Sequence, residues 1–439
     1  MNNIDLNKQL FSYLHSSPTP FHAVANIQKY LLSHNFSQLY ESDKWHLKQG
    51  QSYFVLRDNG AVIAFTLGLH EPVTEGFRML AAHTDSPALQ IKPKPSISEG
   101  SFLNLGVEIY GGALLNSWFD RDLSLAGRVC CETGNGSLEI MLIDFKRALL
   151  TIPSVAIHLD REANEKKTVH RQNHMPPILA QDCNNNFPDF NAFLSAQLQR
   201  QYPAAKIKEI LSFDIFCYDT QPPTYTGLNN EMLSGSRLDN LLSCFVGMST
   251  LAAAGNNYSN MLICTNHEEN GSVSASGASG AFTDAVLERI APDPVRRRIT
   301  LHNSFLISMD NSHATHPNFK EKTDPAHLVL LNKGPVIKIN ANQRYATNSI
   351  SSAVFKNLCK KIEVTPQEFV MRSDMTCGST VGPMTAARLG LKTVDIGVPS
   401  LAMHSIREHT GAEDPLLLYR TIMIFLQTES SAWNLHNVT

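Results

Sequence analysis

The sequence predicts an α/β fold in which helices cover a mixed, largely parallel sheet, with an inserted and mostly β domain. From residue 233 onward, helix-like and strand-like segments alternate, which is typical of βαβ units. From about residue 95 to 232, short β-like runs are instead broken by Gly and Asn. We therefore expect a discontinuous main domain over residues 1–93 and 233–439, and an insertion over 94–232.

The first part of the chain is predicted to form two helices followed by strands. One helix covers residues 4–14, the turn SSPTP follows, and a second helix begins at Phe21. The apolar runs SYFVLR, AVIAFTLG and RMLAAH predict strands. The next segment, KPKPSISEG, contains Pro and Gly, so we expect a connector and a domain boundary there.

The remaining elements follow from the same patterns. Within the insertion, LNLGVEIYGG, LAGRVCCE and SLEIMLIDF predict strands, and a helix is expected near 190–200. In the second part of the main domain, we expect helices at 239–254, 282–290 and 349–361, with strands at 260–265, 304–309 and 392–396.

Composition excludes several classes of function. The 439 residues are 43% apolar and 18% charged, which is enough apolar material for a large core. A net charge of -3 gives no basic stripe, so neither nucleic acid nor an anionic membrane is an expected partner. We find no signal-peptide pattern at the start and no apolar run long enough to span a membrane. Eight cysteines without a CxxC pair indicate reduced thiols in a cytoplasmic protein.

Five short segments carry side chains that can bind metal ions, and most of them follow apolar runs. The segments are MLAAHTDSP, SGSRLDN, MLICTNHEENGS, FLISMDNSHA and LAMHSIRE. They supply His83 and Asp85, Asp239, Glu268 and Glu269, Asp310, and His404. Ligands in open α/β sheets bind outside the carboxyl ends of the strands, so these distant groups can meet in one crevice.

Two histidines and three carboxylates suit a pair of zinc ions, which can activate a shared water and polarise a carbonyl. A further Glu beside a ligand Glu can take the proton from that water. HEEN differs from the HExxH helix of other zinc proteases. Taken singly, each residue has a structural alternative: a strand-end histidine is usually structural, a Glu-Glu pair is usually solvated, and His404 fits a buried core position.

The ligand segments and the sequence around them resemble the aspartyl aminopeptidase family of co-catalytic metallo-aminopeptidases. The resemblance covers about residues 15–425 and also rests on SPTPFHAV, YGGALLNSWFDRDLSLAGRV, IPSVAIHL, NQRYATN and CGSTVGP. It implies a zinc aminopeptidase-like fold, a bound pair of divalent ions that are zinc by default, and substrates that are peptides with a free N-terminus.

The resemblance also implies a role for each residue. Asp239 bridges two metal ions, His83 and Asp310 complete one site, and Glu269 and His404 complete the other. Glu268 is the general base, and Asp85 accepts a hydrogen bond from the imidazole of His83.

The family's insertion makes dimer contacts, and its dimers assemble into dodecamers. The resemblance therefore implies self-association, with His158 of one copy reaching the active site of another. The alternative for His158 is a structural histidine within a strand.

The substrate pocket departs from the family pattern. Members selective for acidic residues carry a basic side chain just before QRY, where this chain has Asn342. Arg344 or Arg407 is the candidate replacement, and the CGSTVGP loop with Cys377, Gly378 and Thr380 is expected to line the pocket. Two other functions stay open: a two-metal deacylase or carboxypeptidase, and a catalytically silent shell-forming assembly.

Overall fold

The computed structural model describes residues 2–182, 184 and 186–434, so that Cys183 lies outside the described residues. The described chain divides into two compact units. The larger runs to Asp85, resumes over Pro223–Met403 and continues from Glu408, whereas the smaller holds Ser86–Pro222 and His404–Arg407. These limits differ from the expected insertion at 94–232, because the sheet of the smaller unit already begins with a strand at Ala88.

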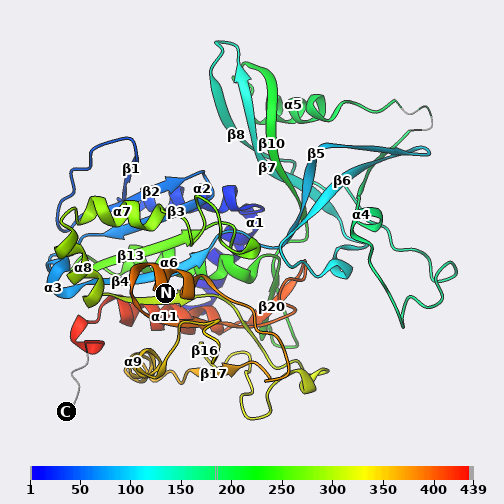
Figure 1. Cartoon of the computed structure of the whole chain (residues 1–439). Coiled ribbons are helices and arrows are strands. Elements are labelled where there is room, and N and C mark those ends of the chain that lie inside the picture. The colour runs from blue at the N-terminus through cyan, green and yellow to red at the C-terminus, as the bar shows by residue number, and fades with distance from the viewer. Residues whose placement is uncertain (1, 183, 185, 435–439) are drawn as a thin grey trace. The chain divides into compact units, whose positions relative to one another are not determined.

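A large mixed sheet forms the centre of the larger unit (Figure 1). Its strand order is β1 (Ser37–Leu39), β2 (Ser52–Arg57), β3 (Ala61–Thr66), β13 (Ser259–Thr265), β4 (Phe77–His83), β14 (Phe305–Met309), β18 (Lys392–Gly397), β16 (Val336–Ile339) and β17 (Gln367–Val370). The central run β13–β4–β14–β18 is parallel throughout, as are β1/β2 and β16/β17. The remaining neighbours are antiparallel. The predicted mixed, largely parallel sheet is confirmed.

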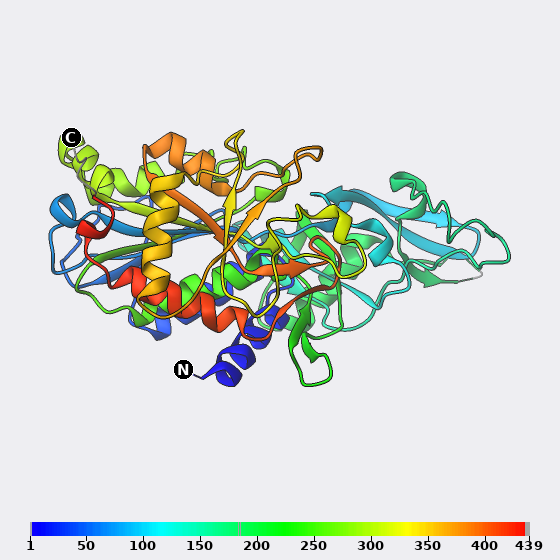
Figure 2. The same cartoon turned by 90° about the horizontal axis from the view of Figure 1, so that it is seen from below.

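Helices cover both faces of this sheet. One face packs against α1 (Asn3–Ser16), α2 (Pro20–Ser33), α6 (Leu238–Ala253), α9 (Ser349–Lys360) and α11 (Asp414–Leu426). The other face packs against α7 (Phe282–Ile290), α8 (Pro294–Asn303) and α10 (Val381–Leu389). Figure 2 shows α9 and α11 crossing their face of the sheet. Helix α6 is buried from Leu238 to Leu251 because its sequence is apolar on nearly all sides.

A second, smaller sheet completes the larger unit. It joins β11 (Thr224–Thr226), β12 (Met232–Gly235), β20 (Glu408–Gly411), β19 (Pro399–Leu401) and β15 (Ser312–His313), in that order. A short helix, α3 (Pro72–Glu75), precedes β4. The sequence did not predict this sheet, because its strands are too short to show a two-residue period.

The smaller unit is an antiparallel sheet with its own core. The strand order is β8 (Leu138–Asp144), β7 (Leu123–Thr133), β10 (Ile207–Asp219), β5 (Ala88–Glu99), β6 (Phe102–Tyr110) and β9 (Ile178–Gln181). The helices α4 (Arg171–His174) and α5 (Phe190–Gln201) belong to the same unit. Its core contains Trp118, Phe190 and Ile215, and is separate from the clusters of the larger unit.

The connector expected at KPKPSISEG is wrong, because β5 runs through it. The pairing of β5 with β6 shifts register between Ile91 and Ser96, the stretch that holds Pro93 and Pro95. Proline lacks the N–H that a sheet ladder needs, so a strand accommodates it where the pairing is irregular.

Within the described part of the chain, none of the helices combines the length and the apolar character that a membrane span requires.

Candidate metal centre

The carboxyl ends of three neighbouring parallel strands bring the predicted side chains together. His83 is the last residue of β4, Glu268 and Glu269 follow β13, and Asp310 follows β14. Since β4 lies between β13 and β14 in parallel register, these ends meet at one edge of the sheet. Asp239 reaches the same place from the start of α6, where its backbone is not yet helical.

His83 lies at the centre of a buried three-residue group. Its Nε2 atom is 3.4 Å from Oδ1 of Asp239 and 3.5 Å from Oδ1 of Asp310. One ligand atom from each residue lies within 4.8 Å of the others. Burying two carboxylates against one imidazole costs free energy unless a positive charge compensates them.

Glu268 and Glu269 form a second group with His83, again with ligand atoms within 4.8 Å of one another. Both glutamates are half-buried and belong to the short 3₁₀ turn Glu268–Asn270. Burial raises the pKa of Glu268 to about 8 and also raises the pKa of Glu269, with nearby carboxylates adding to both shifts. These two carboxyl groups therefore keep their protons to a higher pH than an ordinary glutamate does.

The residues present fit divalent metal ions. Oδ1 of Asp310 is buried and accepts no hydrogen bond from the described residues. Burial alone would raise the pKa of Asp310, but the charges of Lys338 and His83 hold it below its usual range. An ionised carboxylate oxygen beside an imidazole nitrogen is a donor set that zinc prefers.

Asp85 holds the glutamate turn more directly than it holds the imidazole. Its Oδ1 accepts the N–H of Glu268 and its Oδ2 accepts the N–H of Glu269, each at 3.1 Å. Nδ1 of His83 lies 3.0 Å from the backbone oxygen of Asp85, but 3.5 Å from its carboxylate. With Nδ1 facing that carbonyl, Nε2 of His83 faces Asp239 and Asp310.

Further residues that the sequence did not single out fix the backbone of the predicted ligands. Oε2 of Glu408, which is buried, accepts the N–H of Asp239 at 2.9 Å. Nδ2 of Asn240 donates to the carbonyl of Met309 at 2.8 Å, next to Asp310. Cys244 donates to the carbonyl of His83 at 3.0 Å. Glu408 is the last residue of the segment LAMHSIRE. A carboxylate in that apolar context was the sign in the sequence that could have indicated its role.

The predicted site residues His404 and His158 belong to the smaller unit. His404 lies in the segment His404–Arg407, where its Nδ1 is 3.2 Å from the carbonyl of Gly112. His158 is exposed in a turn, so the alternative of a structural histidine within a strand is wrong. Their parts in the metal centre and in catalysis stay predictions.

The predicted pocket residues lie on two loops tied by one buried carboxylate. Asn342, Arg344 and Gly378 are exposed, and Cys377 is half-buried. Thr380 is buried and donates to Oδ1 of Asp395 at 2.6 Å, while the N–H of Ala346 donates to Oδ2 at 2.6 Å. Thr380 thus holds the loop with its hydroxyl. In the smaller unit, Arg407 donates to the carbonyl of Pro222.

A cavity of about 260 Å³ lies within the larger unit, beside the strand that follows Asp310. Its lining is mainly apolar but includes three side chains that can carry positive charge. The lining includes Phe369, Met375 and Met403 together with His313, His316 and Lys322.

Most of the chain matches a known protein family. The sequence model described as "Aminopeptidase I zinc metalloprotease (M18)" matches residues 13–426. The chain belongs to the M18 peptidase family. Its M18 relatives include the "Probable M18 family aminopeptidase 2" of Stutzerimonas stutzeri strain A1501, which is 48% identical over 421 residues, covering 96% of this chain and 98% of the relative. The protein of the same description in Pseudomonas aeruginosa strain UCBPP-PA14 is also 48% identical over that length.

Solved M18 structures share the fold. One chain of a structure described as the "Ape4 and Nbr1 complex" matches with a TM-score of 0.93 at 36% identity, over 97% of this chain and 86% of that chain. The "S. cerevesiae mApe1 dodecamer" has a TM-score of 0.84 at 25% identity and covers 98% of each chain. The predicted family and enzyme class, a metallo-aminopeptidase, are confirmed.

Proposed function

We propose that this M18 aminopeptidase removes N-terminal residues from peptides at a centre of two zinc ions. The observation that carries the proposal is the meeting of His83, Asp239, Glu268, Glu269 and Asp310 at one edge of the sheet. The family is one of zinc metalloproteases, and imidazole and carboxylate donors suit that metal.

In this proposal, His83, Asp239 and Asp310 would hold one ion, and Asp239, Glu269 and His404 would hold the other. Such ions, when bound, lower the pKa of water and polarise a carbonyl.

Glu268 is the proposed general base. One of its carboxylate oxygens takes a proton from the attacking water and passes it to the amine nitrogen of the departing peptide. Asp85 supports this role because it fixes the backbone N–H groups of Glu268 and Glu269. Glu268 and its neighbour Glu269 thus take different roles, as proton carrier and as ligand.

The proposed preference is for an acidic N-terminal residue. A buried carboxylate without a partner is costly, so a cation must face the acidic side chain of the substrate. Asn342 is uncharged and cannot be that cation. The exposed Arg344 and the cavity residues Lys322, His313 and His316 support this preference. Loss of Asp cleavage relative to Ala cleavage in Arg344→Gln or Lys322→Gln identifies which cation acts.

We also propose that copies of the chain assemble, as in the yeast dodecamer, and that His158 stabilises the reacting carbonyl oxygen in a neighbouring copy. The exposed turn around His158 also exposes Val155 at 63%, Ile157 at 47% and Leu159 at 83%. Clustered apolar exposure of this kind marks an interaction surface. His158→Phe is expected to lower kcat while zinc content and assembly mass stay unchanged.

The deciding experiment measures hydrolysis of aminoacyl chromogenic substrates bearing Asp, Glu, Leu, Ala or Lys, with and without a chelator. Release that stops with chelator and returns with zinc supports the aminopeptidase. Release confined to Asp and Glu supports the acidic preference, and equal release of neutral residues removes it. Hydrolysis only of N-acylated peptides would instead support a deacylase.

A further inference from the structure

A buried lysine lies behind the metal centre. Lys338 belongs to β16, whose other residues are Val336, Ile337 and Ile339, and only 2% of Lys338 is exposed. Lysine is almost never fully buried unless it is paired. Its place within an apolar strand therefore calls for a specific partner.

The partner of Lys338 is a predicted metal ligand. Its Nζ atom lies 3.1 Å from Oδ2 of Asp310 and 5.4 Å from the centre of the Tyr345 ring. The other carboxylate oxygen of Asp310, Oδ1, is the one that lies 3.5 Å from Nε2 of His83. Thus Oδ2 of Asp310 faces the ammonium group of Lys338, and Oδ1 faces the imidazole of His83.

We propose that Lys338 is a positioning residue for the metal centre. By occupying Oδ2, it fixes the rotation of the Asp310 carboxylate and leaves Oδ1 alone to bind an ion. Residues that orient metal ligands in this way typically change metal affinity about 10- to 100-fold when they are lost. The inference rests on the proposed metal-binding function.

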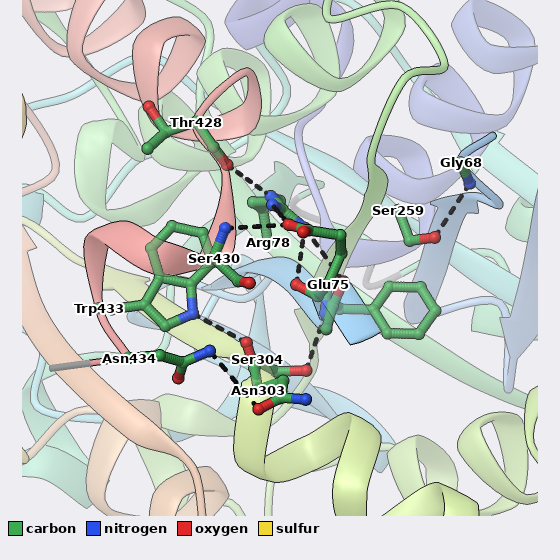
Figure 3. Close-up of polar contacts among 12 residues, drawn as sticks. Gly68, Glu75, Arg78, Ser259, Asn303, Ser304, Thr428, Ser430, Trp433 and Asn434 are labelled. Atoms are coloured by element: carbon green, nitrogen blue, oxygen red, sulfur yellow. Dashed lines mark hydrogen bonds and ion pairs between the residues drawn. The ribbon is translucent and has the colours of Figure 1, made fainter. Parts of the chain in front are cut away.

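The chain offers a matched control in Arg78, a second buried cation. Arg78 lies near the start of β4, at the end opposite to His83. It donates to Glu75 at 2.9 Å and to the carbonyl of Thr428 at 2.8 Å (Figure 3), and it stacks on Tyr258. None of these partners is a predicted ligand, so losing Arg78 tests the general effect of removing a buried cation.

The experiment titrates zinc into the metal-stripped full-length protein in competition with a chromophoric chelator. In Lys338→Met, one of the two sites is expected to bind zinc about 10- to 100-fold more weakly than in the wild type. Lys338→Arg, which keeps the positive charge, is expected to bind zinc more tightly than Lys338→Met does. Arg78→Met is expected to lower Tm yet bind zinc as the wild type does.

A double variant separates positioning from a general loss of packing. In an Asp310→Asn background, Lys338→Met is expected to cause little further loss of zinc affinity, because its partner is already gone. If Lys338→Met does not fold, Lys338→Gln provides the same comparison.

The outcomes separate the two proposals. Zinc affinity in folded Lys338→Met equal to that of the wild type would overturn the role of Lys338 and leave the proposed function intact. A wild-type protein that binds no zinc would overturn the metal centre itself.

Discussion

Single residues in the candidate metal centre have pKa values that depend on one another. His83 is surrounded by Asp239 and Asp310, and the glutamates lie against the same imidazole. Burial alone would lower the pKa of His83, but the neighbouring carboxylates of these aspartates raise it above its ordinary value. The metal-free centre is therefore expected to be protonated, and the substitutions below separate proton transfer from metal binding.

Glu268→Gln is expected to lower kcat by about 10²- to 10⁴-fold, because the amide keeps the shape of the side chain but cannot accept the proton. Zinc content should stay at the wild-type value. The matched control is Glu269→Gln, which should lose zinc as well as activity. Steady-state kinetics together with metal analysis checks both variants. Near-normal turnover in Glu268→Gln would assign the base to another residue.

The stability gained from zinc is expected to increase from pH 5.5 to pH 8. The pKa of Glu268 is raised from 4.5 to about 8 in the folded, metal-free protein, mainly by burial. A raised carboxyl pKa stabilises the fold below the unfolded pKa, and this contribution is lost as pH rises toward 8. The pKa of Asp310 is lowered, so its titration affects stability only below pH 5.5.

Zinc must displace the protons bound at Glu268 and Glu269, so its affinity rises as those protons become easier to remove. Tm values of metal-free and zinc-loaded protein at pH 5.5, 7 and 8 provide the measurement. If zinc raised Tm less at pH 8 than at pH 5.5, this account would be contradicted.

At the scale of elements, the ends of β4, β13 and β14 were predictable and their surroundings were not. Each of these strands is mostly apolar, and metal-capable side chains stand at its end or within a few residues after it, a pattern visible in the sequence. The strand β15 has only two residues, Ser312 and His313, and carries no period that a sequence can show. Helix α8 was missed because PVRRRITLHN is mostly polar.

The partner of Lys338 could not be predicted from the sequence. A lysine in the run VIKI is unusual, which marks the position, but its partner depends on strand order. The strand β18 lies between β16 and β14, and β14 leads into Asp310. That order is set by packing between segments far apart in the chain, so the Lys338–Asp310 pair follows only from the fold.

Asp85→Asn tests the anchoring of the glutamate turn. The turn Glu268–Asn270 has only three residues, and the Asp85 carboxylate accepts two of its N–H groups. An amide in its place presents an NH₂ group to one of these donors, so one hydrogen bond is lost. We expect zinc affinity or kcat to fall about 10- to 100-fold. The matched control Asp284→Asn, on α7, should leave zinc affinity and kcat unchanged. Wild-type values in Asp85→Asn would show that the turn keeps its conformation without the Asp85 carboxylate.

For the whole molecule, the residues of the predicted metal site come from points far apart in the sequence yet belong mostly to one compact unit. His83, Asp239, Glu268, Glu269 and Asp310 all lie in the larger unit. His404 is the exception, since the chain returns to the smaller unit for four residues, His404–Arg407. No local pattern in LAMHSIRE indicates this return, because it depends on contacts with distant segments such as the carbonyl of Gly112.

Zinc loading is therefore expected to stabilise the two units unequally. Ligand binding stabilises whatever structure forms the site, by about 4 kcal/mol when the free ion is at about 1,000 times its Kd. Amide hydrogen exchange with and without zinc measures this region by region. Protection should increase at the carboxyl ends of β4, β13 and β14, and stay constant in β7 and β8, whose core is separate. Increased protection over 404–407 would support His404 as a ligand, because that segment belongs to the unit that otherwise does not respond. Equal gains in protection across both units would contradict this prediction, because they would show that the two cores unfold as one.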